Sequence, residues 1–298
     1  MDWARDKAIW PNSAHSRFVD VRPHRWHVQE AGKGPTVLLL HGAGGATQSW
    51  RGLFPLLAER YHVVAPDLPG QGFTRIGRRL RCGLGPMAED VAALCRHEGW
   101  APDAIIGHSA GAVLALELTR HLAPRAIVGL NAALGKFEGV AGWLFPLMAK
   151  FMAVNPVIPP LLARMAGGEN RARELLASTG SAIDDEGVAL YHRLMTDSGH
   201  IDGTLTMMAQ WKIDGLLARL PGIETPTLLI AGARDETVPP KTSERAAARL
   251  PHGTYRCLDG LGHLAHEEAP ALIFDEITHF LDPILEGRSA ATPALYGS

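Results

Sequence analysis

Ser109 lies in the sequence Gly-His-Ser-Ala-Gly (107–111), which fits the pattern G-x-S-x-G. In this pattern a serine occupies a sharp turn between a strand and a helix and presents its hydroxyl clear of the sheet. The surrounding sequence suits such a turn, because an apolar strand pattern (103–111) leads into residues with helical spacing (112–122). The pattern alone recurs by chance and also fits a structural turn. Its context favours Ser109 as a nucleophile.

A serine hydroxyl is a poor nucleophile near neutral pH, so it needs a base, and the base needs an acid that orients it. Asp235 stands at the end of an apolar strand pattern (226–235), where its carboxylate would point toward the crevice at the strand ends. Glu236 is the neighbouring candidate, and a helix-capping or loop role is the alternative for Asp235. Because Asp235 comes first after the strand, we expect it to be the acid.

Two histidines compete for the role of base within the sequence GLGHLAHEEAP (260–270). His263 directly follows Gly-Leu-Gly at the end of the last predicted strand, from which it can reach Ser109. His266 lies three residues further on, toward a helix that Pro270 is expected to start. Position therefore favours His263 as the base and leaves His266 a supporting or partly exposed place.

The same two histidines could instead be half of a metal site. A zinc site needs a third and usually a fourth ligand at compatible spacing. Here the histidines are followed by Glu267 and Glu268, the order is not that of a helical H-E-x-x-H motif, and no cysteine is near in sequence. We therefore expect no metal and no cofactor.

Acyl transfer also needs N–H donors for the oxyanion that develops in the transition state. The sequence HGAGG (41–45) follows a buried strand pattern, so its backbone N–H groups can face Ser109. We expect the donors to be the backbone N–H groups of Ala43 and of Ala110, the residue after the nucleophile. Glycines with a purely structural role are the alternative for this loop.

Composition restricts the partners and the compartment. The chain has 298 residues, a formal net charge of −2 and no run of basic residues, which argues against a nucleic-acid partner. Its three cysteines are far apart and lack C-x-x-C spacing, which indicates a reducing compartment rather than a disulfide framework. The first 18 residues are polar and charged, without the apolar core of a signal peptide. We expect a cytoplasmic protein.

Short apolar runs alternate with helical patterns along most of the chain. The predicted strands are 25–32, 36–42, 62–70, 103–111, 126–132, 226–235 and 254–260. Such alternation predicts the α/β class, with a mostly parallel sheet that helices cover on both faces. The alternation stops between about 135 and 222, where helical patterns are interrupted by prolines. We therefore predict a core domain (1–134 and 223–288), a helical cap (135–222) and a disordered tail (289–298).

The predicted cap begins with an apolar segment, 139–163, which prolines divide into pieces too short to cross a membrane. It predicts either helices packed on the main domain or an apolar lid over a pocket, with contact to a membrane interface. His200 is a lone cap histidine, and such residues are seldom ligands. Large apolar side chains of the cap could line a pocket for an apolar substrate, and core packing is the alternative; they are Trp143, Met207, Met208 and Trp211.

In this order, the motifs resemble those of the α/β-hydrolase superfamily, over roughly residues 17–285. The resemblance implies an eight-stranded, mostly parallel sheet with an inserted helical cap, and it assigns the catalytic histidine to His263. The chain departs from many relatives at Gln71, where they carry histidine. Asn131 lies where some members carry the triad acid, and because an amide cannot serve as that acid, Asp235 gains support.

A narrower resemblance extends over the whole chain, cap included. The chain resembles the accessory α/β-hydrolases of magnesium chelation in bacteriochlorophyll biosynthesis. This resemblance implies magnesium chelatase subunits as partners and a tetrapyrrole as the apolar ligand. The segments that carry it are WPNSAHSRFV, RWHVQEAG, APDLPGQGFT, GHSAGA, LTMMAQW and GLGHLAHEEAP. Three functions stay open: a serine hydrolase with this accessory role, a non-catalytic protein that binds a porphyrin or the chelatase, and a generic esterase or C–C bond hydrolase.

Overall fold

The computed structural model of the chain describes residues 1–135, 155, 157–165 and 167–286. Within them, one eight-stranded sheet has the strand order β1-β2-β4-β3-β5-β6-β7-β8. The strands are β1 (Ser16–Val21), β2 (His24–Ala31), β3 (Thr36–Leu40), β4 (His62–Pro66), β5 (Ala104–His108), β6 (Ala126–Leu130), β7 (Thr227–Gly232) and β8 (Gly253–Leu258). The predicted fold class is confirmed, although the apolar pattern did not identify β1.

The sheet is antiparallel only at one edge. β1 pairs with β2 and β2 with β4 in antiparallel fashion, whereas the other neighbouring strands are parallel. The carboxyl ends of the parallel strands therefore meet along one edge of the sheet, and loops after β3, β5, β7 and β8 come together there. This is the edge to which the predicted site residues were assigned.

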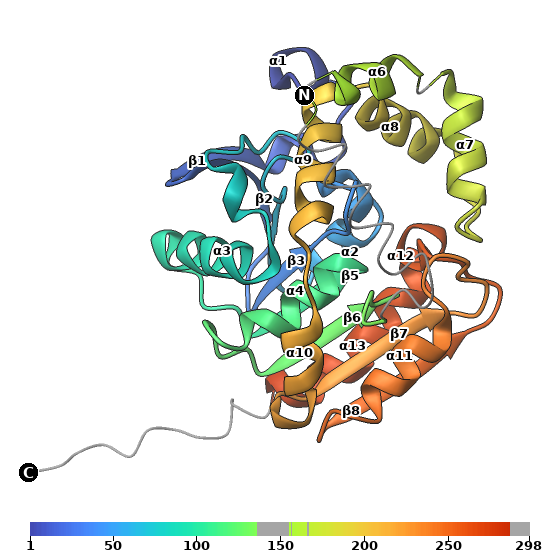
Figure 1. Cartoon of the computed structure of the whole chain (residues 1–298). Helices are drawn as coiled ribbons and strands as arrows, with labels where there is room; N and C mark the ends of the chain where they lie inside the picture. The colour runs from blue at the N-terminus through green and yellow to red at the C-terminus, as the bar shows by residue number, and fades with distance from the viewer. Residues whose placement is uncertain (136–154, 156, 166, 287–298) are drawn as a thin grey trace, which may run out of the picture.

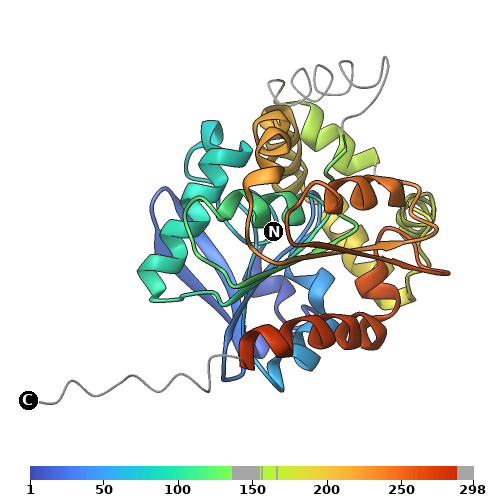
Figure 2. The same cartoon turned by 90° about the horizontal axis from the view of Figure 1, so that it is seen from below.

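Helices cover both faces of the sheet, as Figure 2 shows. Neighbouring residues of β3 alternate between two hydrophobic clusters, with Leu38 in one and Leu39 in the other. Because both faces are buried, the strand reads as a continuous apolar run. One cluster receives side chains from α3 (Leu84–Glu98), α4 (Ala110–Leu118) and α11 (Pro240–Ala247), and the other receives them from α2 (Leu53–Ala58) and α13 (Pro270–Glu286).

Short helices complete the core and differ from the pattern in one place. Residues 47–60, whose spacing is helical, form two pieces, a 3₁₀ turn η2 (Thr47–Trp50) and α2, because Ser49 and Arg51 donate to carbonyls three residues back rather than four. The other short elements are α1 (Trp3–Asp6), η1 (Ser13–His15), η3 (Arg79–Arg81), η4 (Leu220–Gly222) and α12 (Ala265–Glu268).

The described part of the predicted cap is helical and lies between β6 and β7 in the chain. Its helices are α6 (Ile158–Met165), α7 (Glu169–Ala177), α8 (Asp185–Met195), α9 (Ser198–Gln210) and α10 (Asp214–Arg219). In Figure 1, α6, α7 and α8 lie at the upper end of the molecule, and α9 runs down from them toward α10. Leu216 and Leu217 of α10 pack in the same cluster as α3 and α4, so this helix is part of the core packing.

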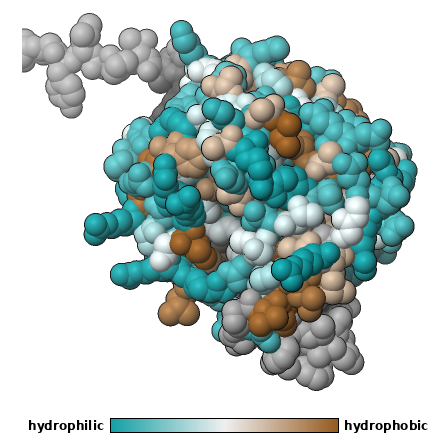
Figure 3. Space-filling model, turned by 90° about the horizontal axis from the view of Figure 1, so that it is seen from above, coloured by the Kyte–Doolittle hydropathy of each residue, from teal (hydrophilic) through white to brown (hydrophobic). Residues whose placement is uncertain are grey.

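Apolar side chains are exposed on one face of α6. Leu161 and Met165 of α6 and Val157 just before it recur every four residues, and each is about half exposed or more. Figure 3 views this end of the molecule, where apolar side chains form separate small patches among polar ones. Every helix that the structure describes is too short or too polar to span a bilayer.

Candidate active site

Ser109 occupies a strained turn between β5 and α4. Its backbone dihedral angles are φ 52° and ψ −114°, which a non-glycine residue rarely adopts. Its N–H donates to the Leu130 carbonyl over 2.9 Å, which fixes the turn to the neighbouring strand β6. A Cβ on Gly107 would lie 2.3 Å from Gly111, and one on Gly111 would lie 2.0 Å from the Leu40 oxygen. The G-x-S-x-G glycines are therefore required by close backbone approach.

Asp235 and His263 form a buried pair at the ends of β7 and β8. His263 Nδ1 donates to Asp235 Oδ2 over 2.8 Å. The other carboxylate oxygen accepts the N–H groups of Thr237 and Val238, each over 2.8 Å. Because a carboxylate only accepts, the neutral imidazole carries its proton on Nδ1, which leaves Nε2 as a base. Glu236, the alternative acid, has an exposed side chain.

The serine turn and the histidine loop are joined directly. His108, the residue before Ser109, donates from Nε2 to the His263 carbonyl over 2.9 Å, and the two rings are 4.9 Å apart between centroids. Burial, together with the neighbouring histidines His266 and His263, lowers the pKa of His108 well below its ordinary value, so it stays neutral. The residue before Ser109 is thus in direct contact with His263. The role of His108 was not apparent in the sequence, where it filled a variable position of the motif.

Asn131 is a second contributor that the sequence left without a role. It follows β6 with a positive φ of 49°, which asparagine tolerates better than most residues. Its Nδ2 donates to Asp235 Oδ2 over 2.8 Å and to the Gly262 carbonyl over 3.1 Å. In the sequence, Asn131 was considered only for the role of triad acid, which an amide cannot fill. Its amide instead holds the acid and the histidine loop together.

His266 is buried rather than partly exposed. Its ring lies 4.5 Å from that of His108 and 4.8 Å from that of Trp50, and neither ring nitrogen has a hydrogen-bond partner among the described residues. Burial, and then the charges of His263 and Arg51, lower its pKa to about 3. It therefore adds no positive charge beside His263 near neutral pH.

The HGAGG loop lies beside the nucleophile. A Cβ on Gly42 would be 3.1 Å from Ser109 Cβ, and the Gly45 N–H donates to the Gly42 carbonyl over 3.1 Å. In the described part of the chain, the N–H groups of Ala43 and Ala110 donate to no acceptor. An oxyanion site requires such N–H groups, and these two remain the predicted donors.

The predicted cap pocket is only partly described. Trp143 lies outside the described residues. Met207 is 1% exposed and accepts a hydrogen bond from Gln71 Nε2 over 3.2 Å, and Trp211 packs against the core. Met208 is half-buried. Met207 and Trp211 thus have core contacts, the alternative raised for them, and a pocket remains a prediction.

The fold and the arrangement of these loops define a class of protein. The family model for the alpha/beta hydrolase fold matches residues 35–270, and the chain belongs to this family. An alpha/beta hydrolase fold protein from Burkholderia ambifaria superimposes with a TM-score of 0.75 at 20% identity, covering 88% of this chain and 97% of that one. The fold is therefore the one that the sequence motifs implied.

Two curated relatives narrow the comparison. The magnesium-chelatase 30 kDa subunit of Rhodobacter capsulatus is 46% identical over 264 residues, covering 88% of this chain and 93% of the relative. The pimeloyl-[acyl-carrier protein] methyl ester esterase of Methylococcus capsulatus is 29% identical, covering 84% of this chain and 96% of the relative. This chain is thus similar to a protein named for magnesium chelatase and, more distantly, to an esterase.

Proposed function

We propose that this protein is a serine hydrolase that cleaves an ester, thioester or related acyl bond. The observation that carries the proposal is the buried Asp235–His263 pair beside the strained turn of Ser109. A strained non-glycine residue stores conformational free energy of about 1–3 kcal/mol, which a fold keeps only where surrounding contacts fix it. Strain at a serine next to a buried His–Asp pair supports a nucleophile.

Each group has a defined task in this reaction. Ser109 Oγ attacks the acyl carbon while His263 Nε2 takes its proton, and Asp235 stabilises the imidazolium through Nδ1. The oxyanion accepts hydrogen bonds from the N–H groups of Ala43 and Ala110. His263 then returns the proton to the leaving group, and water hydrolyses the acyl-enzyme by the same steps in reverse. Asp235 orients the imidazole and does not itself take the proton in this mechanism.

We further propose an accessory role beside magnesium chelatase in bacteriochlorophyll biosynthesis, in the cytoplasm. Support comes from the 46% identity to a protein named as a magnesium-chelatase subunit. The substrate would be an apolar molecule of tetrapyrrole type, admitted under the cap. The exposed apolar face of α6 supports contact of the cap with an apolar ligand or a membrane interface.

A fluorophosphonate probe tests the nucleophile. The wild-type protein should be labelled at Ser109, and Ser109→Ala should lose labelling completely. Ser198→Ala, which changes an exposed serine at the start of α9, is the matched control and should label like wild type. Equal labelling of Ser109→Ala and wild type would remove Ser109 from the mechanism.

A second candidate function is non-catalytic binding of a porphyrin or of the chelatase on the hydrolase scaffold. One observation favours it, namely that the 46% identical relative is named as a subunit and not as a hydrolase. Complementation separates the two functions in a phototrophic host that lacks the gene. Rescue of pigment synthesis by Ser109→Ala would establish the binding function, whereas failure of a folded Ser109→Ala protein supports catalysis.

A further inference from the structure

The loop with the predicted oxyanion donor is held at one end by a neutral histidine of its own. His41 Nδ1 donates to the Gly42 carbonyl over 2.8 Å, and its Nε2 accepts the Leu68 N–H over 2.8 Å. Burial lowers the pKa of His41, which keeps the ring neutral and able to make both bonds. The carbonyl it holds belongs to the residue before Ala43.

A second histidine repeats this arrangement from the inserted helix α9. His200 Nε2 donates to the Gly44 carbonyl over 3.1 Å, and its Nδ1 accepts the Gly72 N–H over 3.0 Å. Gly44 is the residue after Ala43, so the two histidines fix the carbonyl groups on either side of the donor. Each ring also accepts one N–H from the loop after β4.

Gln71 completes the contacts of Gly44. Its Oε1 accepts the Gly44 N–H over 2.7 Å, and its Nε2 donates to Met207 Sδ of α9 over 3.2 Å. Both backbone polar groups of Gly44 are thereby fixed, one directly by α9 and one through a side chain that rests on α9. The Ala43 N–H between these anchors has no acceptor among the described residues.

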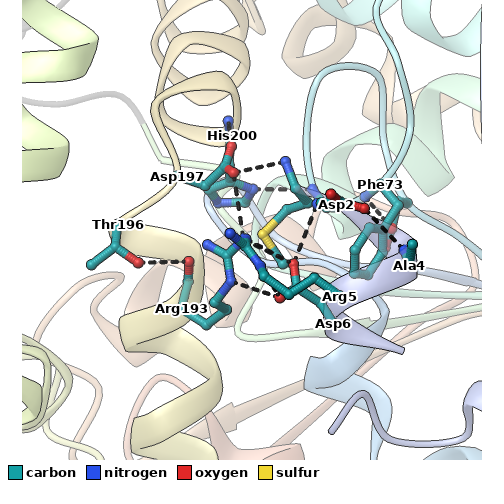
Figure 4. A network of polar contacts seen from close by, with 12 residues as sticks. Asp2, Ala4, Arg5, Asp6, Phe73, Arg193, Thr196, Asp197 and His200 are labelled. Atoms are coloured by element: carbon teal, nitrogen blue, oxygen red, sulfur yellow. Dashed lines mark hydrogen bonds and ion pairs between the residues drawn. The ribbon is translucent and has the colours of Figure 1, made fainter. Parts of the chain in front are cut away.

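Helix α9 packs closely on the loop after β4. A Cβ on Gly203 would lie 1.9 Å from the Gly70 oxygen, so the helix backbone packs directly on the loop after β4. Asp197 caps the helix and accepts the His200 N–H over 3.0 Å. Arg193 pairs with buried Asp6 over 2.8 Å and lies 3.7 Å from Asp197, and Figure 4 shows this network at the start of α9.

We propose that His200 is a positioning residue that couples the cap to the oxyanion site. With α9 seated, the imidazole holds the Gly44 carbonyl and thereby aims the Ala43 N–H at the site beside Ser109. Without the imidazole, the Gly44 carbonyl loses this bond and the Ala43 N–H is no longer held toward the site. The inference rests on the proposed serine hydrolase function.

The protonation state of His200 agrees with this role. Burial lowers its pKa to about 4; the Gly44 carbonyl, Asp197 and Asp67 act in the opposite direction, and His41 acts in the same direction as burial. Near neutral pH the ring is therefore uncharged and can accept the Gly72 N–H while it donates to Gly44. An imidazolium could make only the second of these bonds.

The test measures the rate of phosphonylation at Ser109 by a fluorophosphonate, and kcat and KM for a p-nitrophenyl ester, with the full chain. His200→Ala should slow phosphonylation and kcat about 10- to 100-fold with little change in KM, because a preorganised donor acts mainly in the transition state. His200→Gln should stay within about threefold of wild type, since a carboxamide can donate and accept. His192→Ala removes another histidine of the predicted cap, whose ring bonds to the Gly167 carbonyl over 2.8 Å, and should match wild type.

The outcomes separate this inference from the proposed function. Absence of labelling in the wild-type protein would overturn both. Labelling of wild type and folded His200→Ala at equal rates would overturn the inference alone, as would equal losses in His200→Ala and His200→Gln. Should His200→Ala fail to fold, His200→Gln is compared with His200→Asn, whose shorter side chain cannot make both bonds. At least a fivefold slower rate for His200→Asn supports the inference, and equal rates overturn it.

Discussion

The two halves of the candidate site are held in different ways. In the base half, Asp235 and His263 follow strands of the core sheet, and Asn131 and His108 at the ends of two further strands hold them. In the oxyanion half, the loop after β3 depends on side-chain contacts with the inserted helix α9, through His200 and Gln71. The predicted cap also contacts the base half, where the Thr179 carbonyl accepts the His263 N–H and the Ser181 hydroxyl accepts the Leu264 N–H. Because core residues hold the base half as well, we expect cap movement to disturb the oxyanion half more.

The electrostatics of the two halves differ as well. The base half contains a buried carboxylate with four hydrogen-bond donors around it, so its chemistry depends on a charge. The loop of the oxyanion half is instead held by uncharged groups, namely the His41 and His200 rings and the Gln71 carboxamide. Changes in the base half should affect proton transfer, and changes in the oxyanion half should affect the alignment of N–H groups.

The largest effect is expected from Asp235→Asn. The amide removes the charge that stabilises the imidazolium and presents an N–H to Nδ1, which favours the wrong tautomer; kcat should fall about 10⁴-fold. Ester hydrolysis with purified protein measures this. Asp185→Asn, at an exposed position in the first turn of α8, is the matched control. A loss below tenfold for Asp235→Asn would remove this residue as the acid.

The pH dependence of stability should report on His200 in the oxyanion half. Its pKa is lowered from 6.5 to about 4 in the folded protein, so the unfolded chain binds a proton more readily between these values. The contribution of the neutral ring is full above pH 6.5 and is lost as pH falls toward 4, by about 3 kcal/mol. Denaturant unfolding of wild type and His200→Gln across this window measures it. A wild-type curve parallel to that of His200→Gln would contradict the expectation.

Gln71→Leu tests the other anchor of Gly44. Removing the acceptor of the Gly44 N–H should lower kcat about tenfold with KM nearly unchanged, a smaller loss than that from the base half. Gln210→Leu is the matched control, because this amide of α9 bonds to the Arg79 and Thr206 carbonyls and not to the oxyanion loop. Equal kinetics of the two variants would show that Gly44 needs no anchor from Gln71.

The base half could largely be predicted from the sequence, because order along the chain decides which loops meet. Ser109, Asp235 and His263 follow apolar strand patterns, and the carboxyl ends of parallel strands meet at one edge. Position along the chain also favoured His263 over His266 as the base. The burial of His266 was not predicted, because it depends on contacts with Trp50 and His108, which are distant in sequence.

The oxyanion half could be predicted only in part. The HGAGG motif identified Ala43 as a candidate donor. The contact of His200 with Gly44 joins residues 156 apart, and no pattern in the sequence indicates that helix α9 lies beside this loop. A lone histidine in a helix carries no pattern that distinguishes a structural from a positioning role. Gln71 was noted only as a departure from relatives, because its bond to Gly44 requires the fold.

The smallest effect on kcat is expected from Glu267→Gln, at the contact of the histidine loop with α8. Burial raises the pKa of Glu267 from 4.5 to about 8, against the Tyr191 hydroxyl at 2.7 Å and Arg51 at 3.8 Å. A raised pKa means that stability is full below pH 4.5 and is lost as pH rises through 8. The uncharged variant should therefore gain on wild type by up to about 5 kcal/mol between pH 5 and pH 9, which is about 10 °C in Tm. Thermal unfolding of both proteins measures this difference in Tm. A difference that shrinks with rising pH would mean that the carboxyl is already ionised in the folded protein at pH 7. An unchanged kcat at pH 7 would assign this contact to cap attachment and not to the base half.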